Sequence, residues 1–506
     1  MSTHSVLTDR KLVLTAVILA FLPVVLDMTI LHVAVPKLTQ SLNASGTEVL
    51  WIIDIYPLLM AGLLVPMGTL ADRVGNRTLL LLGLIVFGLA SAFAAFAQSA
   101  LMLIAARIFL ALGGSMIVPC VLGLIRKTFE DEAERATALG VWGMVGAAGA
   151  AVGPLVGGSL LEHFWWGAVF LINVPAILLV APACYFLLPR REKTTPGKWS
   201  VGQSLLLIAG ILSLVYSIKT AAAEQHLSIT IGLVAAFGVV CLALFARKQL
   251  RSPTPMLDLS LLSHPAIIAG LLMSVIVSGA LAGVELTLAQ EMQYVLGMSP
   301  LQAGIFMVPI MVAAAIGSPV AGYLSNRFGL RLVATLSLIV SAAALLFLAL
   351  KDFHTPGFWV PFALAALGLA LSIGLTASSI AIMSSVDASK GGAAGALEAT
   401  GYELGSGLGI TMFGVFMSGV FSHIIKLPAS LPTALAQRSA RTIGDSYIVA
   451  AELPASQGTA LVEAAKAAFT KTHAILLTTS AGLIALLAVV VFVTLANYRS
   501  FPSDPS

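Results

Sequence analysis

The chain has 506 residues, of which 58% are hydrophobic and only 10% are charged. A soluble protein carries about 25% charged residues, so this composition excludes a water-soluble globular protein and indicates one surrounded by lipid. The formal net charge of +4 is too small and too dispersed for a nucleic-acid-binding protein. Cys120, Cys184 and Cys241 lie within apolar runs and predict no disulfide framework.

Fourteen apolar stretches are long enough to cross a bilayer, which takes about 20 mostly apolar residues. No cleavable signal peptide is expected, because Arg10 and Lys11 precede a stretch too long for a signal's apolar region. The predicted spans lie at about 12–35, 48–70, 78–98, 101–125, 137–160, 168–188, 203–221, 228–246, 265–287, 303–324, 331–350, 358–383, 397–421 and 474–496.

The placement of basic residues predicts the orientation of these spans. With a cytoplasmic N-terminus, the short outer loops hold only Lys37, Lys219 and Lys351. The inner loops hold many more, namely Arg73, Arg77, Arg126, Lys127, Arg135, Arg190, Arg191, Lys193, Lys198, Arg247, Lys248, Arg251, Arg327, Arg331 and Lys390. This asymmetry predicts a multi-pass protein of the cytoplasmic (inner) membrane with both termini in the cytoplasm. An odd number of spans would scramble the pattern.

One long loop, at about 422–473, is predicted outside the membrane. Its stretch from Pro454 to Lys471 has a helix-compatible composition, with Leu461 and Phe469 along one side. We interpret this stretch as a short amphipathic helix that rests on the membrane or forms a lid. A gate or a partner-binding element is the alternative.

An internal repeat divides the chain. Residues 68–77 (GTLADRVGNR) recur as residues 322–331 (GYLSNRFGLR), and each copy follows the second span of a six-span set. Parallel repeats with a site at their interface are a transporter architecture. We therefore predict an all-α integral membrane protein. Its parts are an N-terminal six-helix bundle (1–195), two inserted transmembrane helices (196–255) and a C-terminal six-helix bundle with the long outer loop (256–506).

Three motifs resemble those of the major facilitator superfamily, and within it those of the fourteen-span drug:proton antiporters (DHA2-type). They are the loop 68–77, the span-four segment 103–114 (LIAARIFLALGG) and the span-five segment 149–158 (GAAVGPLVGG). Segment 26–36 (LDMTILHVAVP) resembles the span-one signature, although His32 stands where asparagine is usual. Segments 50–56 and 401–405 are similar to pumps for methyl viologen and quaternary ammonium compounds. The resemblance implies two six-helix bundles with two extra helices, fourteen in all.

The resemblance also implies roles for charged and small residues. The two repeat loops could form a conformational latch through Asp72, Arg73, Arg77, Asn326 and Arg327, and topological anchoring is the alternative. Arg107, deep in span four, is implied in proton coupling, and a structural ion pair is the alternative; Asp27 is one possible partner. Gly149, Gly153, Pro154, Gly157 and Gly158 form the antiporter motif. These small residues predict close helix packing, to which the family adds a seal against leakage.

Carboxylates inside the spans are the candidate sites for protons and cations. A lone charge in hydrocarbon costs about 2.5–3.5 kcal/mol, so it is rarely kept without a use. Burial favours the protonated acid, whereas a bound organic cation favours the ionised form. A proton and a cation can therefore exclude each other at one site. The candidates are Asp27, Asp54, Glu285, Glu398 and Glu403. The alternative for each acid is an ion pair or an interfacial position facing water, and His32 is either a proton relay or a structural group.

These observations predict a proton-coupled antiporter. It would export lipophilic cations such as quaternary ammonium compounds, methyl viologen, cationic dyes and biguanides from the cytoplasm. The alternative is a secondary transporter or facilitator for a small nutrient or metabolite. A membrane enzyme or sensor is disfavoured, because the sequence has no metal-ligand cluster, nucleophile elbow or P-loop. We expect no metal, no cofactor and no nucleic acid partner, and a monomer that acts in the bilayer alone or alongside outer-membrane export systems.

Overall fold

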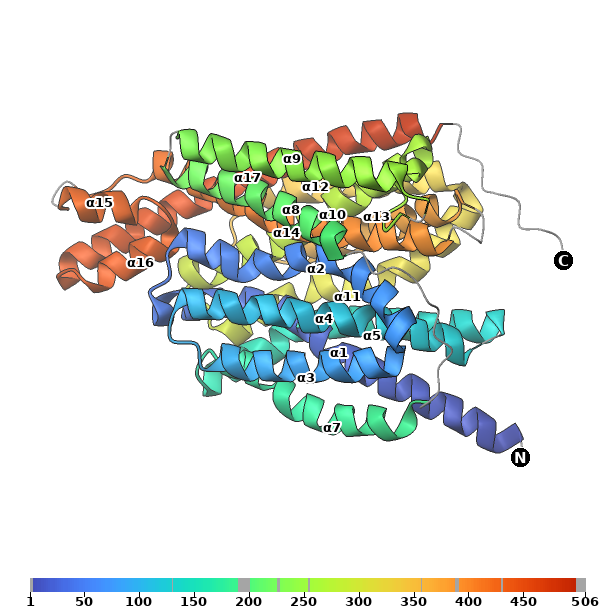
Figure 1. The fold of residues 1–506 in the computed structure, drawn as a ribbon. Coiled ribbons are helices and arrows are strands. Elements are labelled where there is room, and N and C mark those ends of the chain that lie inside the picture. Colours follow the sequence, from blue (N-terminus) through green and yellow to red (C-terminus); the bar gives the residue numbers. More distant parts are fainter. Residues whose placement is uncertain are drawn as a thin grey trace.

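The computed structural model describes residues 3–129, 131–189, 201–224, 228–253, 255–355, 357–386, 391–428 and 431–496. These residues form an elongated bundle of roughly parallel and antiparallel helices (Figure 1). Fourteen of the helices are long and apolar enough to cross a membrane, which confirms the predicted number of spans. Of the basic residues in the predicted inner loops, Arg190, Arg191, Lys193, Lys198 and Lys390 lie outside the described residues.

The first six spans share one apolar core. Its buried side chains come mainly from the helices before residue 190. The sixth span is split at Ile172 into a single turn and a longer helix. The helices are α1 (Thr3–Leu42), α2 (Gly46–Val74), α3 (Asn76–Ala95), α4 (Ala100–Thr128), α5 (Glu132–His163), α6 (Ala168–Leu171) and α7 (Asn173–Leu187).

The last six spans form a second core, and two helices lie between the sets. The second core collects side chains from α10 to α13 and from α17. The intervening pair is α8 (Val201–Glu224) and α9 (Ile229–Arg251). The remaining elements are the 3₁₀ helix η1 (Leu259–Ser263), α10 (Pro265–Gln290), the π-helix η2 (Glu291–Val295), α11 (Pro300–Phe328), α12 (Leu330–Ala349), α13 (Trp359–Met383), α14 (Gly391–Ile424), α15 (Thr433–Ser439), α16 (Ile443–Ala451) and α17 (Ala455–Thr494).

The sequence repeat has a structural counterpart at both ends of α2 and α11. Ser45 and Ser299 each begin a capping box, in which a serine hydroxyl and a Glu or Gln side chain satisfy the first free amides of the helix. Gly75 and Gly329 end these helices with φ of 95° and 85°. Only glycine adopts this backbone without strain. Both copies therefore form the same sharp connection to the next helix.

The two sets of spans meet along a few helix pairs. These are α2 with α14, α5 with α11, and α1 with α10. Helix α8 packs against α9 and lies on both α2 and α14, so the inserted pair touches both sets. Helix α1 begins and α17 ends at one end of the bundle, which we call the terminal end, while α15 and α16 project from the opposite loop end (Figure 1). The predicted domain boundaries remain predictions, and residues 195 and 196 lie outside the described residues.

Two predictions about the loop end are wrong. The helix predicted from Pro454 to Lys471 is not a separate element resting on the membrane, because α17 runs unbroken from Ala455 through the last span to Thr494. Lys219 is not in an outer loop but is buried within α8. The α8 helix continues for three residues beyond the predicted end of the span at 221, since residues 220–224 (TAAAE) suit a helix.

Candidate functional site

Asp27 and Arg107 form a buried ion pair between α1 and α4. Arg107 Nη1 donates to Asp27 Oδ2, and both side chains are at most 2% exposed. Arg107 Nε also donates to the Ile52 carbonyl at 3.0 Å, which fixes the guanidinium against α2. Among the residues that the structure describes, Asp27 Oδ1 is buried and has no hydrogen-bond partner. The pair thus compensates the buried charges while one carboxylate oxygen stays available.

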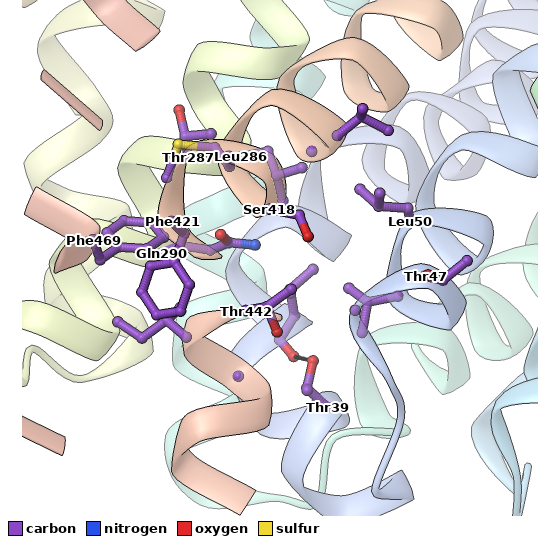
Figure 2. A pocket seen from close by; sticks show the side chains of 18 of the residues that line it. Thr39, Thr47, Leu50, Leu286, Thr287, Gln290, Ser418, Phe421, Thr442 and Phe469 are labelled. Atoms are coloured by element: carbon purple, nitrogen blue, oxygen red, sulfur yellow. Dashed lines mark hydrogen bonds between the residues drawn. The ribbon is translucent and has the colours of Figure 1, made fainter. Parts of the chain in front are cut away.

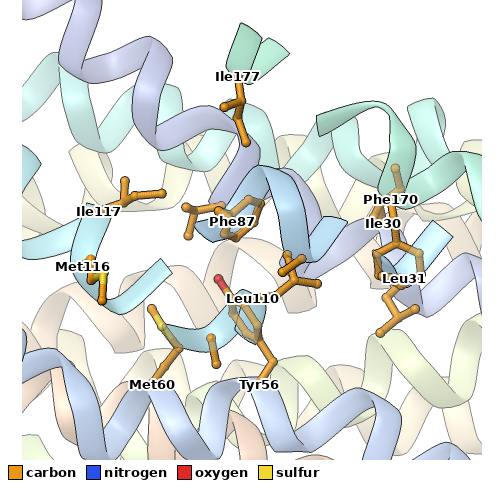
Figure 3. Close-up of a cluster of buried hydrophobic side chains, with 14 of the residues drawn as sticks. Ile30, Leu31, Tyr56, Met60, Phe87, Leu110, Met116, Ile117, Phe170 and Ile177 are labelled. Carbon is orange, nitrogen blue, oxygen red and sulfur yellow. The ribbon is translucent and has the colours of Figure 1, made fainter. Parts of the chain in front are cut away.

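Tyr56 links this pair to the second set of spans. The Arg107 guanidinium lies over the Tyr56 ring, with Cζ 4.6 Å from its centroid. Figure 3 shows Tyr56 beside Met60 in the apolar core. The Tyr56 hydroxyl is buried and has no hydrogen-bond partner among the described residues. Glu403 on α14 lies close enough to Tyr56 to act on it electrostatically. Within the described part of the chain, Glu403 Oε2 is also buried without a hydrogen-bond partner. Acids from both sets of spans therefore approach one aromatic side chain.

Asp54 forms a second buried ion pair, and its partner is Lys219 of the inserted helix α8. Lys219 Nζ lies 2.9 Å from Asp54 Oδ1 and 2.7 Å from Oδ2. Thr411 on α14 donates to Asp54 Oδ2 at 2.5 Å. Arg107 is therefore not the only basic residue deep in the bundle. Sequence reasoning missed Lys219 because it treated lysines near span ends as markers of water-exposed loops.

Glu285 faces His32 across the boundary between α10 and α1. Glu285 Oε2 lies 3.5 Å from His32 Nδ1, and both side chains are largely buried. Gln293 Nε2 donates to the Val33 carbonyl at 3.0 Å a short way along the same boundary. Glu398, by contrast, is half-buried on α14, where Ser379 donates a hydrogen bond to it. The structure thus places Glu285 at the interface of the two sets, and Glu398 in a separate polar contact.

The described contacts of the repeat loops lie within each loop's own set of spans. Asp72 and Arg73 are exposed at the end of α2, and Asn326 and Arg327 are exposed at the end of α11. Arg327 donates to the Tyr323 hydroxyl of its own helix at 2.9 Å. Arg77 donates to the Tyr185 carbonyl of α7 at 2.6 Å. Each of these contacts stays within one set of spans, and the conformational latch between the two repeat loops remains a prediction.

The small residues of α5 allow close contact with both sets of spans. Gly149, Gly153 and Gly157 face α1, where an added Cβ would meet Val25, Thr29 or Ile30. A Cβ at Gly158 would lie 2.6 Å from Leu301 Cα, and one at Gly304 would lie 2.7 Å from the Pro154 carbonyl oxygen. The motif therefore brings the backbones of α5 and α11 together near the loop end.

A cavity of about 90 Å³ lies between the two sets at the loop end. Figure 2 shows Thr39, Thr47, Thr287, Gln290 and Ser418 around it, together with apolar residues such as Leu50. The start of α16 closes one side through Thr442, Ile443 and Gly444. Lys219 also lines this cavity. Lys219 is therefore shared between the cavity wall and the Asp54 pair.

A fourth buried polar cluster, around Glu291, was missed by sequence reasoning. Glu291, the first residue of η2, lies 3.4 Å from His473 Nδ1 of α17, and both are 2% exposed or less. Thr470 donates to the other Glu291 oxygen at 2.9 Å. The Phe353 ring stacks on His473 with centroids 6.1 Å apart. The structural sign of this cluster is the π-helix η2, because π-bulges often lie at functional sites. The sequence alone does not reveal a π-helix, so it offered no signal for this cluster.

Comparisons with known proteins assign the family. The profile of the Major Facilitator Superfamily matches residues 17–409 and, in a second match, 271–499. The chain is 46% identical to the methyl viologen resistance protein SmvA of Salmonella typhimurium, over 96% of this chain and 98% of that protein. It is 36% identical to the multidrug efflux pump LfrA of Mycolicibacterium smegmatis, over 92% of this chain and 93% of the pump.

Solved structures agree on the fold. An inward-facing, unoccupied bacterial homolog of the human lysosomal transporter Spinster superposes with a TM-score of 0.70 at 17% identity, covering 98% of this chain and 99% of the homolog. The nucleoside transporter NupG superposes with a TM-score of 0.58 at 13% identity, covering 90% of this chain and all of NupG. The chain is a multi-pass membrane transporter, not an enzyme, and it belongs to the Major Facilitator Superfamily.

Proposed function

We propose that this protein is a proton-coupled antiporter that exports lipophilic cations from the cytoplasm across the inner membrane. Its substrates would be quaternary ammonium compounds, methyl viologen, cationic dyes and biguanides. The names of two relatives, a methyl viologen resistance protein and a multidrug efflux pump, support export and this substrate class. We expect the protein to work as a monomer, either alone or alongside outer-membrane export systems.

The observation that carries the proposal is the buried carboxylate of Asp27. One oxygen is held by Arg107 while the other has no partner, inside a helix that crosses the membrane. A proton on that free oxygen would weaken the pair, and an organic cation nearby would favour the ionised form. Occupation by one therefore opposes occupation by the other. Glu403, whose free oxygen faces the same region from α14, is the second candidate for this exchange.

The distribution of basic residues supports an assignment of the two ends of the bundle to the two sides of the membrane. Basic residues occupy the last turns of α2, α4, α9 and α11, which all end at the terminal end. Positive residues favour the cytoplasmic side of a membrane, so we assign the terminal end to the cytoplasm. Close contacts between the two sets lie near the loop end, as between Ser299 and Glu162 at 2.5 Å. With the two sets in close contact at the loop end, a substrate would enter between them from the cytoplasmic terminal end.

The repeat loops and the α5 motif fit the same cycle. When the halves close at the cytoplasmic end, Asp72 and Arg73 on one side and Asn326 and Arg327 on the other would meet and latch. The tight α5–α11 contact around Gly158 would then open. While that contact holds, its backbone-to-backbone packing leaves little room for ions to pass, which is the seal that an antiporter needs.

Transport by purified protein in liposomes tests the proposal. An imposed pH gradient should drive ethidium and methyl viologen across the membrane in wild-type vesicles, and Asp27→Asn should abolish the response to the gradient. Asp352→Asn is the matched control, because Asp352 is exposed in the α12–α13 loop and should transport normally. Wild-type transport that ignores both pH and voltage would overturn proton coupling. Uptake of a neutral nutrient with no cation transport would favour a facilitator instead.

A further inference from the structure

The Lys219 ammonium group occupies a site that has the chemistry of an organic-cation receptor. Its Nζ lies 3.7 Å from the centroid of the Trp51 ring and within 2.9 Å of both Asp54 carboxylate oxygens. Trp51 and Asp54 are three residues apart on α2, so they present one face of the helix. An aromatic face beside a carboxylate is how proteins recognise quaternary ammonium ions. Here the bound cation belongs to the protein itself.

One member of this site, Lys219, borders the cavity between the two sets of spans. Lys219 lines the cavity together with Leu50, which is next to Trp51 in sequence, and with Ala222 and Ala223 of its own helix. The walls are mainly apolar, with threonine, serine and glutamine side chains among them (Figure 2). A lipophilic cation that reached the cavity would therefore lie beside Lys219. Displacement of the lysine would open a path to the Asp54 carboxylate, which the lysine holds.

The site also joins three parts of the fold that move relative to one another in a rocking transporter. Asp54 comes from the first set of spans, Thr411 from the last set and Lys219 from the inserted pair. Because the Thr411 hydroxyl donates to Asp54 at 2.5 Å only while α2 and α14 are in contact, separation of these helices would remove one of the carboxylate's partners. The stability of the lysine pair is thus tied to the state of the interface.

We propose that Lys219 is a tethered competitor, an internal cation that occupies the Trp51–Asp54 site and is exchanged for the transported lipophilic cation. This inference rests on the proposed function and adds a role for α8 and α9. The lysine keeps Asp54 compensated when no substrate is bound, which avoids an isolated buried charge. It also lowers the affinity for substrate, because the substrate must displace it. Release of the transported cation is therefore favoured in any state of the transporter in which Lys219 can pair with Asp54 again.

Binding measurements on the purified full-length protein test this exchange. Calorimetry with tetraphenylphosphonium near neutral pH would compare the wild type with Lys219→Met, Asp54→Asn and the Lys219→Met/Asp54→Asn double variant. Lys219→Met should bind the cation at least about tenfold more tightly, equal to about 1.4 kcal/mol. The double variant should lose this gain because the carboxylate is gone. Lys351→Met is the matched control, because Lys351 is exposed beside Phe347, and should bind as the wild type does.

Each outcome bears on a different claim. If folded, monodisperse Lys219→Met binds no more tightly than the wild type, or if the gain persists without Asp54, the tethered-competitor role is wrong. Should Lys219→Met not fold, Lys219→Gln carries the same expectation. If both single variants fail while the double variant folds, the pair is purely structural and the inference is overturned. Absence of cation binding and gradient-driven transport in the wild type would instead refute the proposed function.

Discussion

Removal of the Asp27 carboxylate should destabilise the protein through the arginine it leaves behind. In Asp27→Asn, the Arg107 guanidinium stays charged and buried, with only the Ile52 carbonyl and the Tyr56 ring as remaining partners. Breaking a buried ion pair from one side costs about 3–5 kcal/mol, because the remaining charge is uncompensated. We expect a loss of that size. Asp27→Asn/Arg107→Met removes the stranded charge and should recover most of the stability, but it should not recover transport.

Thermal and denaturant unfolding in detergent would measure these effects as a double-mutant cycle. Arg10 and Glu134 provide the reference, since they form a 3.0 Å pair between α1 and α5 that is partly exposed. Glu134→Gln should therefore cost at most about 1 kcal/mol. If Asp27→Asn is as stable as the wild type, or if the double variant is no more stable than the single one, the buried charge is compensated by other groups and the reasoning fails.

Gly158→Val should abolish efflux and cost about 1–3 kcal/mol, because its Cβ would lie 2.6 Å from the Leu301 backbone. Gly140→Ala on the same helix meets nothing within 4 Å and should transport normally, and equal dye efflux by both variants would contradict the tight α5–α11 contact. Asp445 on α16 should affect the pH dependence of stability, because burial raises its pKa. The folded state then holds its proton more tightly, so the stability contributed is greatest at low pH and falls as pH rises through the folded pKa. Asp445→Asn should flatten this decline in melting temperature. The pKa of Asp352 is lowered by a hydrogen bond from the His354 backbone, so its effect on stability runs the other way. The stability that Asp352 contributes is lost as pH falls. Identical pH profiles for wild type and Asp445→Asn would refute the assignment.

The number of spans and the repeat could be read from the sequence because both follow from local properties. Apolar length determines whether a helix crosses the bilayer, and Gly75 and Gly329 mark equivalent turns by their conformational freedom. The ends of helices were harder, because a helix does not stop where the membrane stops. The α17 helix extends beyond the predicted span through residues 455–473, whose composition suits a separate amphipathic helix equally well.

The partners of the buried charges could be predicted only in part. Asp27 and Arg107 were matched as candidates, since two opposite charges in apolar spans need compensation. The contact between Asp54 and Thr411 joins residues 357 positions apart, and no local pattern records it. Lys219 was assigned to an outer loop because the positive-inside rule applies to lysines in water-exposed loops. The rule does not cover a lysine that is paired with an acid inside the bundle. The roles of all these residues in transport remain predictions.

The 40-residue length of α17 has a mechanical consequence. At 1.5 Å per residue the helix is about 60 Å long, roughly twice the thickness of the hydrocarbon core. Its overhanging half supports α16, which also touches α1 of the opposite set. A tilt of the membrane part by some 20° would swing the free tip through about 10 Å. Spectroscopic labels on α16 and α1 would thus magnify small rotations of the buried bundle into a readily measured distance.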